Sequence, residues 1–325
     1  MISCIKKRGL RVASFGLFLA AGATLHATSL VDGFDVTVFN NFTSQYTAVG
    51  GTLAVGKNLS LTGYGLNGSA PNPNPVAASG GFDTVVGGAL SFQSGTIFGK
   101  VSAGSATVTG STVCSGCVVT GASPIDFTAL EAATKSQSNF LYALSSTGTV
   151  SKPFSTLLLN AGGNATVQVF SITSSQLSGN SGIDITGVSP DMTVIVNVSD
   201  SGSHSASTSS SGLLVNGQQV QSDGMVLFNF APTITSISIT NSFYTSVLAP
   251  SAAVSGGYGS LNGDLVASSY SGNTLFNLSA FAGALPTIPT TTPEPGTFGL
   301  LAGIALSSAA FLYRRGRTGY KRGSK

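Results

Sequence analysis

Most of the chain consists of short runs in which apolar and polar residues alternate. From Val31 to Gly121 the alternation has a period of two and is interrupted by glycine and asparagine. Similar runs return after residue 148, among them "TLLLNAGGNATVQVFSI", "MTVIVNVSD" and "MVLFNFAPTITSISIT". Alternation of this kind is typical of strands that bury one face. The pattern therefore predicts a mainly β protein.

Several of the early runs resemble one another. "LAVGKNLSL" from Leu53 and "TVVGGALSF" from Thr84 align without gaps, "VSAGSATVT" is a weaker copy, and Gly87, Gly104 and Gly121 are each 17 residues apart. Short strands at regular spacing predict a β-solenoid, in which each coil stacks on its neighbour. A β-sandwich is the alternative, because its strands look similar one by one. The proline-rich stretch "SAPNPNPVAASGG" cannot be a strand and is expected to be an inserted loop.

One segment has a helical pattern instead. In "SPIDFTALEAATKSQSNFLYALSSTG", Ser123 can cap a helix, Pro124 suits its first position and Gly148 can end it. We expect an amphipathic helix over about residues 124–146, lying against the β-body. The residues expected on its apolar face are Phe127, Leu130, Ala133, Leu141 and Leu144.

The N-terminus has the pattern of a secretory signal peptide. A basic start is followed by an apolar stretch from Val12 to Ala21 and by small residues up to Ala27. The apolar stretch is short for an uncleaved anchor, which is the alternative. We expect residues 1–27 to be the signal and residues 28–285 to be the folded body.

The C-terminus has the pattern of a membrane segment. A Pro/Thr linker over residues 286–292 precedes "PEP", and residues 296–313 form an uncharged apolar run. As a helix this run is about 27 Å long, enough to span a bilayer. The basic tail, residues 314–325, is expected to stay on the cytoplasmic side.

Charge is concentrated at the two ends. Between residues 28 and 292 the chain has four lysines and ten acidic residues, a net charge of −6, although the whole chain is +3. A body without a basic patch does not fit nucleic-acid binding.

Residues for catalysis or metal binding are sparse in the body. His204 is the only histidine after residue 27 and lies in the serine-rich stretch "SDSGSHSASTSSSG", without a nucleophile-elbow sequence. Carboxylate pairs such as Asp32 with Asp35, or Asp184 with Asp191, could serve a polysaccharide-acting enzyme, but the body has no arginine. We therefore expect no enzyme activity, no cofactor and no metal site.

The two cysteines of "CSGC", Cys114 and Cys117, lie inside β-like sequence. A redox-active CxxC belongs at the start of a helix. In an exported protein a small disulfide that closes a turn is the favoured interpretation, with free thiols as the alternative.

The order of parts at the C-terminus resembles the PEP-CTERM sorting signal, here residues 293–325. The matching residues are Pro293, Glu294 and Pro295, the apolar run, and the basic pair Arg314 and Arg315. The resemblance implies a Gram-negative bacterium with an exosortase, a membrane-embedded enzyme that cleaves near the tripeptide. The inner membrane would then hold the precursor transiently, before transfer to the cell surface or extracellular matrix. A permanent anchor is the alternative.

The body resembles the choice-of-anchor A family. The matching stretches are "FDVTVFNNFTSQYTAVGGTLAVGKNLSLTGYGLN", "SPIDF", "VLFNFA" and "VLAPSAAV...GSLNGDLVASS". The resemblance implies an adhesin-like domain related to ice-binding-type solenoids that also carry one long helix. It implies no catalytic residues.

These observations predict a non-enzymatic surface or matrix protein. Polar Ser/Thr/Asn-rich faces would contact exopolysaccharide, surface glycans or surface proteins. Ice binding is the first alternative, although "TITSISIT" and "TVTGST" provide only fragments of a threonine rank. A polysaccharide-acting enzyme is the second.

Overall fold

The computed structural model describes residues 30–31, 33–68, 79–208, 212–277 and 279–288. A compact unit ends at Ala284, and a second unit begins at Leu285. The expected signal peptide and the expected sorting signal lie outside the described residues. Within the described part of the chain, no helix has the length and apolar character needed to cross a bilayer.

Most strands of the first unit pair in parallel, one coil on the next; the pairs β12 with β13 and β18 with β19 are antiparallel. In β4 (Leu53–Val55) and β7 (Thr84–Gln93), Leu53 lies opposite Thr84, which confirms the gapless alignment of these two segments. Thr84 lies opposite Val101, and Val101 opposite Val118, each 17 residues further on. Large parallel sheets with this spacing are compatible with a β-solenoid. They do not fit a sandwich, whose sheets are antiparallel.

The coils form three faces. The longest strands change register partway along, so that each of them contributes its first half to one face and its second half to another. Face A consists of β11 (Val118–Thr120), the first halves of β9 (Val101–Thr109) and β7, then β4, β1 (Val36–Val38), the first halves of β24 (Leu265–Gly272) and β22 (Ser246–Gly256), β20 (Val226–Phe230), β16 (Thr193–Ser199) and β14 (Val167–Thr173). Face B consists of the second halves of β9, β7, β24 and β22 with β5 (Leu59–Thr62), β2 (Phe42–Gln45), β21 (Ser236–Ile239) and β17 (Ser205–Thr208).

Face C and an accessory sheet complete the β structure. Face C consists of β10 (Thr112–Val113), β8 (Thr96–Ile97), β6 (Gly65–Leu66), β3 (Ala48–Val49), β25 (Leu275–Asn277) and β23 (Ser260–Asn262). The accessory sheet consists of β12 (Thr149–Ser151), β13 (Thr156–Asn160), β15 (Gly182–Thr186), β18 (Leu213–Val215) and β19 (Gln218–Val220). A short helix, α2 (Ser174–Ser178), packs beside β17.

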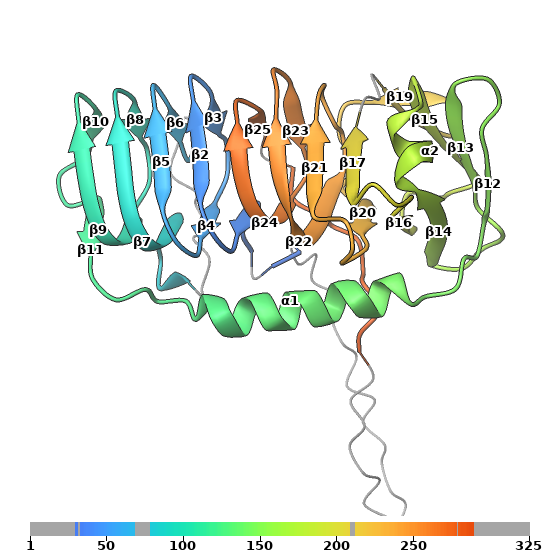
Figure 1. The fold of residues 1–325 in the computed structure, drawn as a ribbon, viewed down its shortest axis with the longest axis horizontal. Helices are drawn as coiled ribbons and strands as arrows, with labels where there is room; N and C mark the ends of the chain where they lie inside the picture. The colour runs from blue at the N-terminus through green and yellow to red at the C-terminus, as the bar shows by residue number, and fades with distance from the viewer. Residues whose placement is uncertain (1–29, 32, 69–78, 209–211, 278, 289–325) are drawn as a thin grey trace, which may run out of the picture. The chain divides into compact units, whose positions relative to one another are not determined.

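The order of the coils in the stack differs from their order in the sequence (Figure 1). β1 pairs with β4 on one side and with β24, from the other end of the body, on the other. The early coils therefore lead away from this junction, and the late coils return to it from β14. We call the junction of β1 and β2 with β24 the seam. Under it, the ring of Phe42 lies 4.7 Å from that of Tyr270 and 5.9 Å from that of Phe276.

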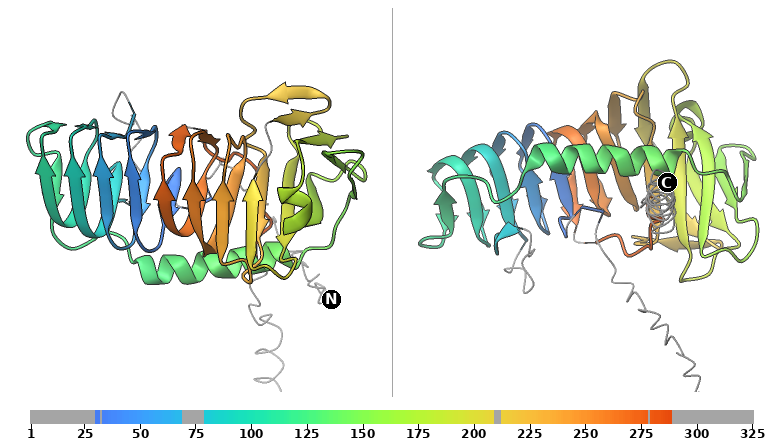
Figure 2. Two further views of the ribbon diagram at one scale, coloured as in Figure 1. Left: turned by 45° about the horizontal axis from the view of Figure 1, so that its top comes forward. Right: turned by 90° about the horizontal axis from the view of Figure 1, so that it is seen from below.

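Helix α1 (Phe127–Tyr142) connects the two sets of coils and runs along the stack (Figures 1 and 2). It is shorter at both ends than the expected 124–146. Its N-cap is Asp126, whose Oδ1 accepts from two N–H groups of the first turn, at 3.0 and 3.1 Å. Ser123, the expected cap, instead bonds within the turn before the helix. The helix ends at an Ala143 cap, before the glycine expected to end it.

Buried amides attach α1 to face A. The Oδ1 of Asn229, on β20, accepts from the Ser138 hydroxyl at 2.6 Å, and its Nδ2 donates to the Ser138 carbonyl at 3.0 Å. The same Nδ2 donates to Asn197, on β16, at 2.9 Å, and Asn197 donates to the Leu141 carbonyl at 2.8 Å. Both asparagines are buried. Helix and sheet are therefore joined by a hydrogen-bond network in addition to apolar packing.

Candidate binding surface

An uninterrupted rank of hydroxyl groups crosses face B. Each of its strands places one serine or threonine at the same register position, with the side chain on the outer side. In stacking order these residues are Thr107, Ser91, Ser60, Thr43, Ser271, Ser255, Ser238 and Ser207. Six of the eight are exposed, and Ser238 and Ser207 are half-buried. Because neighbouring strands are about 4.8 Å apart, the hydroxyls repeat at about that spacing.

A second polar rank lies next to the first. It is formed by residues two positions further along four strands, namely Thr109, Gln93, Thr62 and Gln45. None of the residues in the described face B strands is charged. The intervening side chains, such as Phe42, Leu61 and Phe92, are buried in the core. This packing fixes the strands, so the outer hydroxyls are held in place by a rigid scaffold.

Face B contains two shallow hollows. One, of about 370 Å³, lies at the seam and is lined by Thr43, Ser44, Gln45, Ser60, Thr62, Ser271, Gly272 and Asn273. The other, of about 440 Å³, lies where β17 and β21 meet α2. Its polar lining is entirely serine, namely Ser174, Ser175, Ser178, Ser201, Ser203, Ser205, Ser207, Ser236, Ser238 and Ser255. Several of these serines already bond one another, among them Ser174 with Ser201 at 2.7 Å.

A buried carboxylate pair lies at the seam, at the start of face A. Asp35 precedes β1 and Asp264 precedes β24, and the pairing of these strands brings the two together. Asp35 accepts from the N–H and hydroxyl of Thr52, at 2.6 and 2.8 Å. Asp264 is fully buried. Its Oδ2 accepts from the Leu30 N–H at 3.0 Å.

Burial changes the protonation of this pair. Loss of hydration raises the pKa of Asp264 to about 7. The Leu30 N–H lowers this pKa, the neighbouring Asp35 raises it, and the Phe281 N–H lowers it. Burial also raises the pKa of Asp35, although its hydrogen bonds from Thr52 act in the opposite direction. The seam therefore contains a carboxyl group that changes charge near neutral pH.

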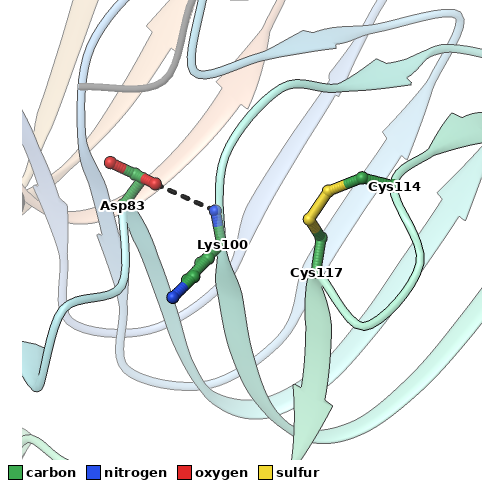
Figure 3. Close-up of a disulfide and its surroundings, with 4 residues drawn as sticks. All are labelled: Asp83, Lys100, Cys114 and Cys117. Atoms are coloured by element: carbon green, nitrogen blue, oxygen red, sulfur yellow. Dashed lines mark hydrogen bonds between the residues drawn. A yellow bond between two sulfur atoms is a disulfide. The ribbon is translucent and has the colours of Figure 1, made fainter. Parts of the chain in front are cut away.

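A disulfide joins Cys114 and Cys117 in the last coil before α1, with 5.4 Å between their Cα atoms (Figure 3). The carbonyl of Cys117 accepts from the Val101 N–H at 2.8 Å, which continues the coil ladder. Between the next two coils of the stack, Asp83 Oδ2 accepts from the Lys100 N–H at 2.9 Å. The bridge closes the turn that leads into β11, the outermost strand of face A.

Reduction of this disulfide should have a small, local effect. The bridge closes a loop of only a few residues, so its stabilisation by loop entropy is about 2 kcal/mol or less. We expect the Cys114→Ser/Cys117→Ser variant to lose at most that amount, with faster hydrogen exchange at β11 and unchanged exchange at β20. A loss of more than about 4 kcal/mol, or faster exchange throughout, would contradict the prediction.

Among the other residues considered for chemistry, His204 lies directly before the face B strand β17, and the rest lie apart from face B strands or outside the described residues. His204 is exposed beside β17, and its Nδ1 lies 2.7 Å from Asp200 and 3.1 Å from the Thr233 carbonyl. Asp184 is on β15 of the accessory sheet, and Asp191 is on an exposed turn. The described residues contain no group of three or more His, Cys, Asp or Glu side chains placed to hold a metal ion. Asp32 and the sorting-signal residues lie outside the residues that the structure describes.

A family model described as "Putative Ice-binding-like adhesive domain" matches residues 27–278. The chain belongs to this family. The match spans the face A, B and C strands and α1, so the hydroxyl ranks lie within the adhesive domain. No curated protein and no solved structure matches the chain.

Sequence reasoning missed the ranks and the seam for the same reason. The members of the first rank come from coils up to 228 residues apart, as the Ser44 to Gly272 contact across the seam shows. The local signal was only that each alternating run contains serine or threonine, and it does not show which of them join into a rank. The gapless alignment of the segments that start at Leu53 and Thr84 was sufficient to place Ser60 opposite Ser91, but nothing local places Thr43 beside Ser271.

Proposed function

We propose that this protein is a non-enzymatic, adhesin-like surface or matrix protein that binds glycans through face B. The observation that carries the proposal is the charge-free hydroxyl rank across eight strands. The adhesive-domain family supports the same general role. Exopolysaccharide and surface glycans are the proposed partners, because the regularly spaced hydroxyls of face B can hydrogen-bond the regularly spaced hydroxyls of a polysaccharide.

Affinity on such a face depends on the number of hydrogen bonds that form at the same time. One hydrogen bond contributes only about 0.5–1.5 kcal/mol net. A rigid rank lets many such bonds form without further ordering of the protein, which favours extended polymers over small molecules. The absence of charge from the described face B strands favours neutral polymers over polyanions.

Charges placed in the middle of the rank should strongly weaken binding. The Ser60→Lys/Ser91→Lys variant puts two bulky, hydrated groups where the polymer would lie, so we expect affinity for the producing cells' exopolysaccharide to fall about tenfold or more. Thr112→Lys, on an exposed position of face C, is the matched control. Sedimentation of the purified full chain with the polymer measures both. Equal binding by the rank variant and the wild type would contradict face B as the contact surface.

Ice binding is the second candidate, and the family description and the regular hydroxyl rank favour it. Six of the eight residues in the rank are serine, so the methyl groups that a threonine rank would present are mostly missing. We therefore expect no thermal hysteresis from concentrated protein. Measurable hysteresis that disappears in the Ser60→Lys/Ser91→Lys variant would make ice the ligand.

We further propose that the body belongs to the choice-of-anchor A group and is delivered by the two terminal signals. In this scheme residues 1–27 direct export, and an exosortase reads Pro293, Glu294 and Pro295 while residues 296–313 hold the precursor in the inner membrane. The mature protein then reaches the cell surface or matrix.

Glu294→Ala tests the delivery scheme. If the tripeptide is read chemically, the variant should be exported but remain as a full-length precursor in the inner membrane. A permanent anchor predicts no change, because Glu294 precedes the apolar run. Immunoblots of membrane and extracellular fractions distinguish the two. Identical full-length, membrane-held wild-type and variant proteins would contradict the sorting signal.

A further inference from the structure

An exposed tyrosine lies at the edge of face B beside the seam. Tyr46 follows β2, is 75% exposed, and has a left-handed backbone with φ of 55°. The equivalent turn positions of the next coils are Gly63, Ser94 and Gly110, with φ of 61°, 54° and 61°. This corner therefore requires a conformation that favours glycine and is costly for an aromatic residue.

The ring of Tyr46 lies over the neighbouring coil. A β-carbon added to Gly63 would come within 2.8 Å of the ring, so the glycine leaves room for the ring to lie against the turn. The Tyr46 N–H donates to the Thr62 carbonyl at 2.9 Å, which fixes the base of the side chain. The exposed ring is thus held beside the 370 Å³ hollow. Tyr46 is not part of the lining, but it directly follows Gln45, and its ring lies over Gly63, which follows Thr62; Gln45 and Thr62 both line the hollow.

Amide groups lie on the other side of the same hollow. With its nitrogen toward the seam, the Asn273 amide donates to the main-chain carbonyls of Gln45 at 3.2 Å and Gly272 at 3.0 Å. This orientation turns the Asn273 oxygen away from both carbonyls. Together with the Gln45 amide and the hydroxyls of Thr62 and Ser271, it provides both donors and acceptors around the hollow.

We propose that this hollow is a subsite for one pyranose ring of a neutral glycan, with Tyr46 as its stacking platform. A pyranose has an apolar C–H face that suits an aromatic ring and a rim of hydroxyls that suits amides and hydroxyls. No residue of the hollow and its rim named here is charged, so a neutral sugar fits better than a uronic acid. The inference rests on the proposed function and adds to it a class of sugar and a position on face B.

Tyr46→Gly is the sharpest test. Glycine suits the left-handed backbone, so the variant should melt no lower than the wild type while losing the platform. Phe154→Gly is the matched control, because Phe154 is also an exposed aromatic residue, with φ of 57°, but lies between β12 and β13 of the accessory sheet. Tyr46→Phe keeps the ring. The probes are neutral hexose trimers of glucose, galactose and mannose, with trigalacturonate as the charged comparison.

Saturation-transfer NMR and calorimetry on the purified full chain, in a detergent without a sugar headgroup, give the affinities. We expect the wild type, Tyr46→Phe and Phe154→Gly to bind at least one neutral trimer similarly, and Tyr46→Gly to bind it about tenfold more weakly. Equal binding by Tyr46→Gly, equal loss in Phe154→Gly, or preference for trigalacturonate would overturn the subsite. If no trimer binds but exopolysaccharide binding persists and needs Ser60 and Ser91, the subsite is wrong and the proposed function stands. If neither is bound, both are wrong.

Discussion

Replacing Asp264 with asparagine should make the protein more stable at pH 8 and leave its stability at pH 4 nearly unchanged. In the folded protein the pKa of Asp264 is raised from 3.8 to about 7, chiefly because its carboxyl group is buried. Between pH 3.8 and pH 7, Asp264 therefore keeps its proton in the folded state but has lost it in the unfolded chain. Stability falls as the pH rises through this window and levels off above pH 7.

The size of the effect follows from the pKa shift. A shift of about 3 units corresponds to about 4 kcal/mol at 1.36 kcal/mol per unit. Asparagine is neutral and its oxygen can still accept from the Leu30 N–H, so Asp264→Asn should gain about 2–4 kcal/mol at pH 8. Urea unfolding of the full chain at pH 4, 6 and 8 measures the free energy of unfolding.

Asp191→Asn, on an exposed turn, is the matched control and should change stability by less than about 0.5 kcal/mol at every pH. Wild-type stability that rises between pH 5 and pH 8 would contradict the account of the seam. So would an Asp264→Asn protein that is less stable than the wild type at pH 8.

Asn229→Ala should cost about 3–5 kcal/mol and act first on α1. The substitution leaves the hydroxyl and carbonyl of Ser138 and the amide oxygen of Asn197 without the partners that they have now. Each such buried group costs about 1–3 kcal/mol when it is left unsatisfied. Chemical denaturation measures the loss, and hydrogen exchange should show faster opening of α1 than of β7.

Asn262→Ala is the control for this variant. Asn262 bonds Asn277 and the Gln221 carbonyl near the surface, where water can replace these contacts. We expect a loss below about 1 kcal/mol. A similar loss in both variants, or unchanged exchange of α1 in Asn229→Ala, would show that the amide network does not hold the helix.

The local part of the fold could be predicted from the sequence. Alternation marks strands wherever one face is buried, and the 17-residue spacing reflects the length of the coils that start at Thr84 and Val101, so both signals are local. The seam could not be predicted, because the pairing of Val36 with Leu265 depends on how two distant segments meet. The capping of α1 was assigned to the wrong residue, since Ser123 and Asp126 both suit a helix start.

The buried stripe of α1 also shows a limit of hydrophobic patterning. Ala133, expected on the apolar face, is exposed, whereas Thr134 and Ser138 are buried. A polar side chain is expected to be exposed unless its hydrogen-bond partner is known. The partner of Ser138 is 91 residues away in the sequence, so it could not be identified locally. The hydroxyl ranks of face B follow the same logic, because their regularity exists across strands and not along any one of them.

The most direct test of the central claim is to locate the polymer on the protein. Backbone NMR shifts of the full chain, with and without oligomers of the producing cells' exopolysaccharide, report which strands are contacted. We expect the largest changes in β2, β5 and the second halves of β22 and β24, with little change in the accessory sheet. Changes centred on face C or on the accessory sheet, with face B unaffected, would contradict the claim that the hydroxyl face binds the glycan.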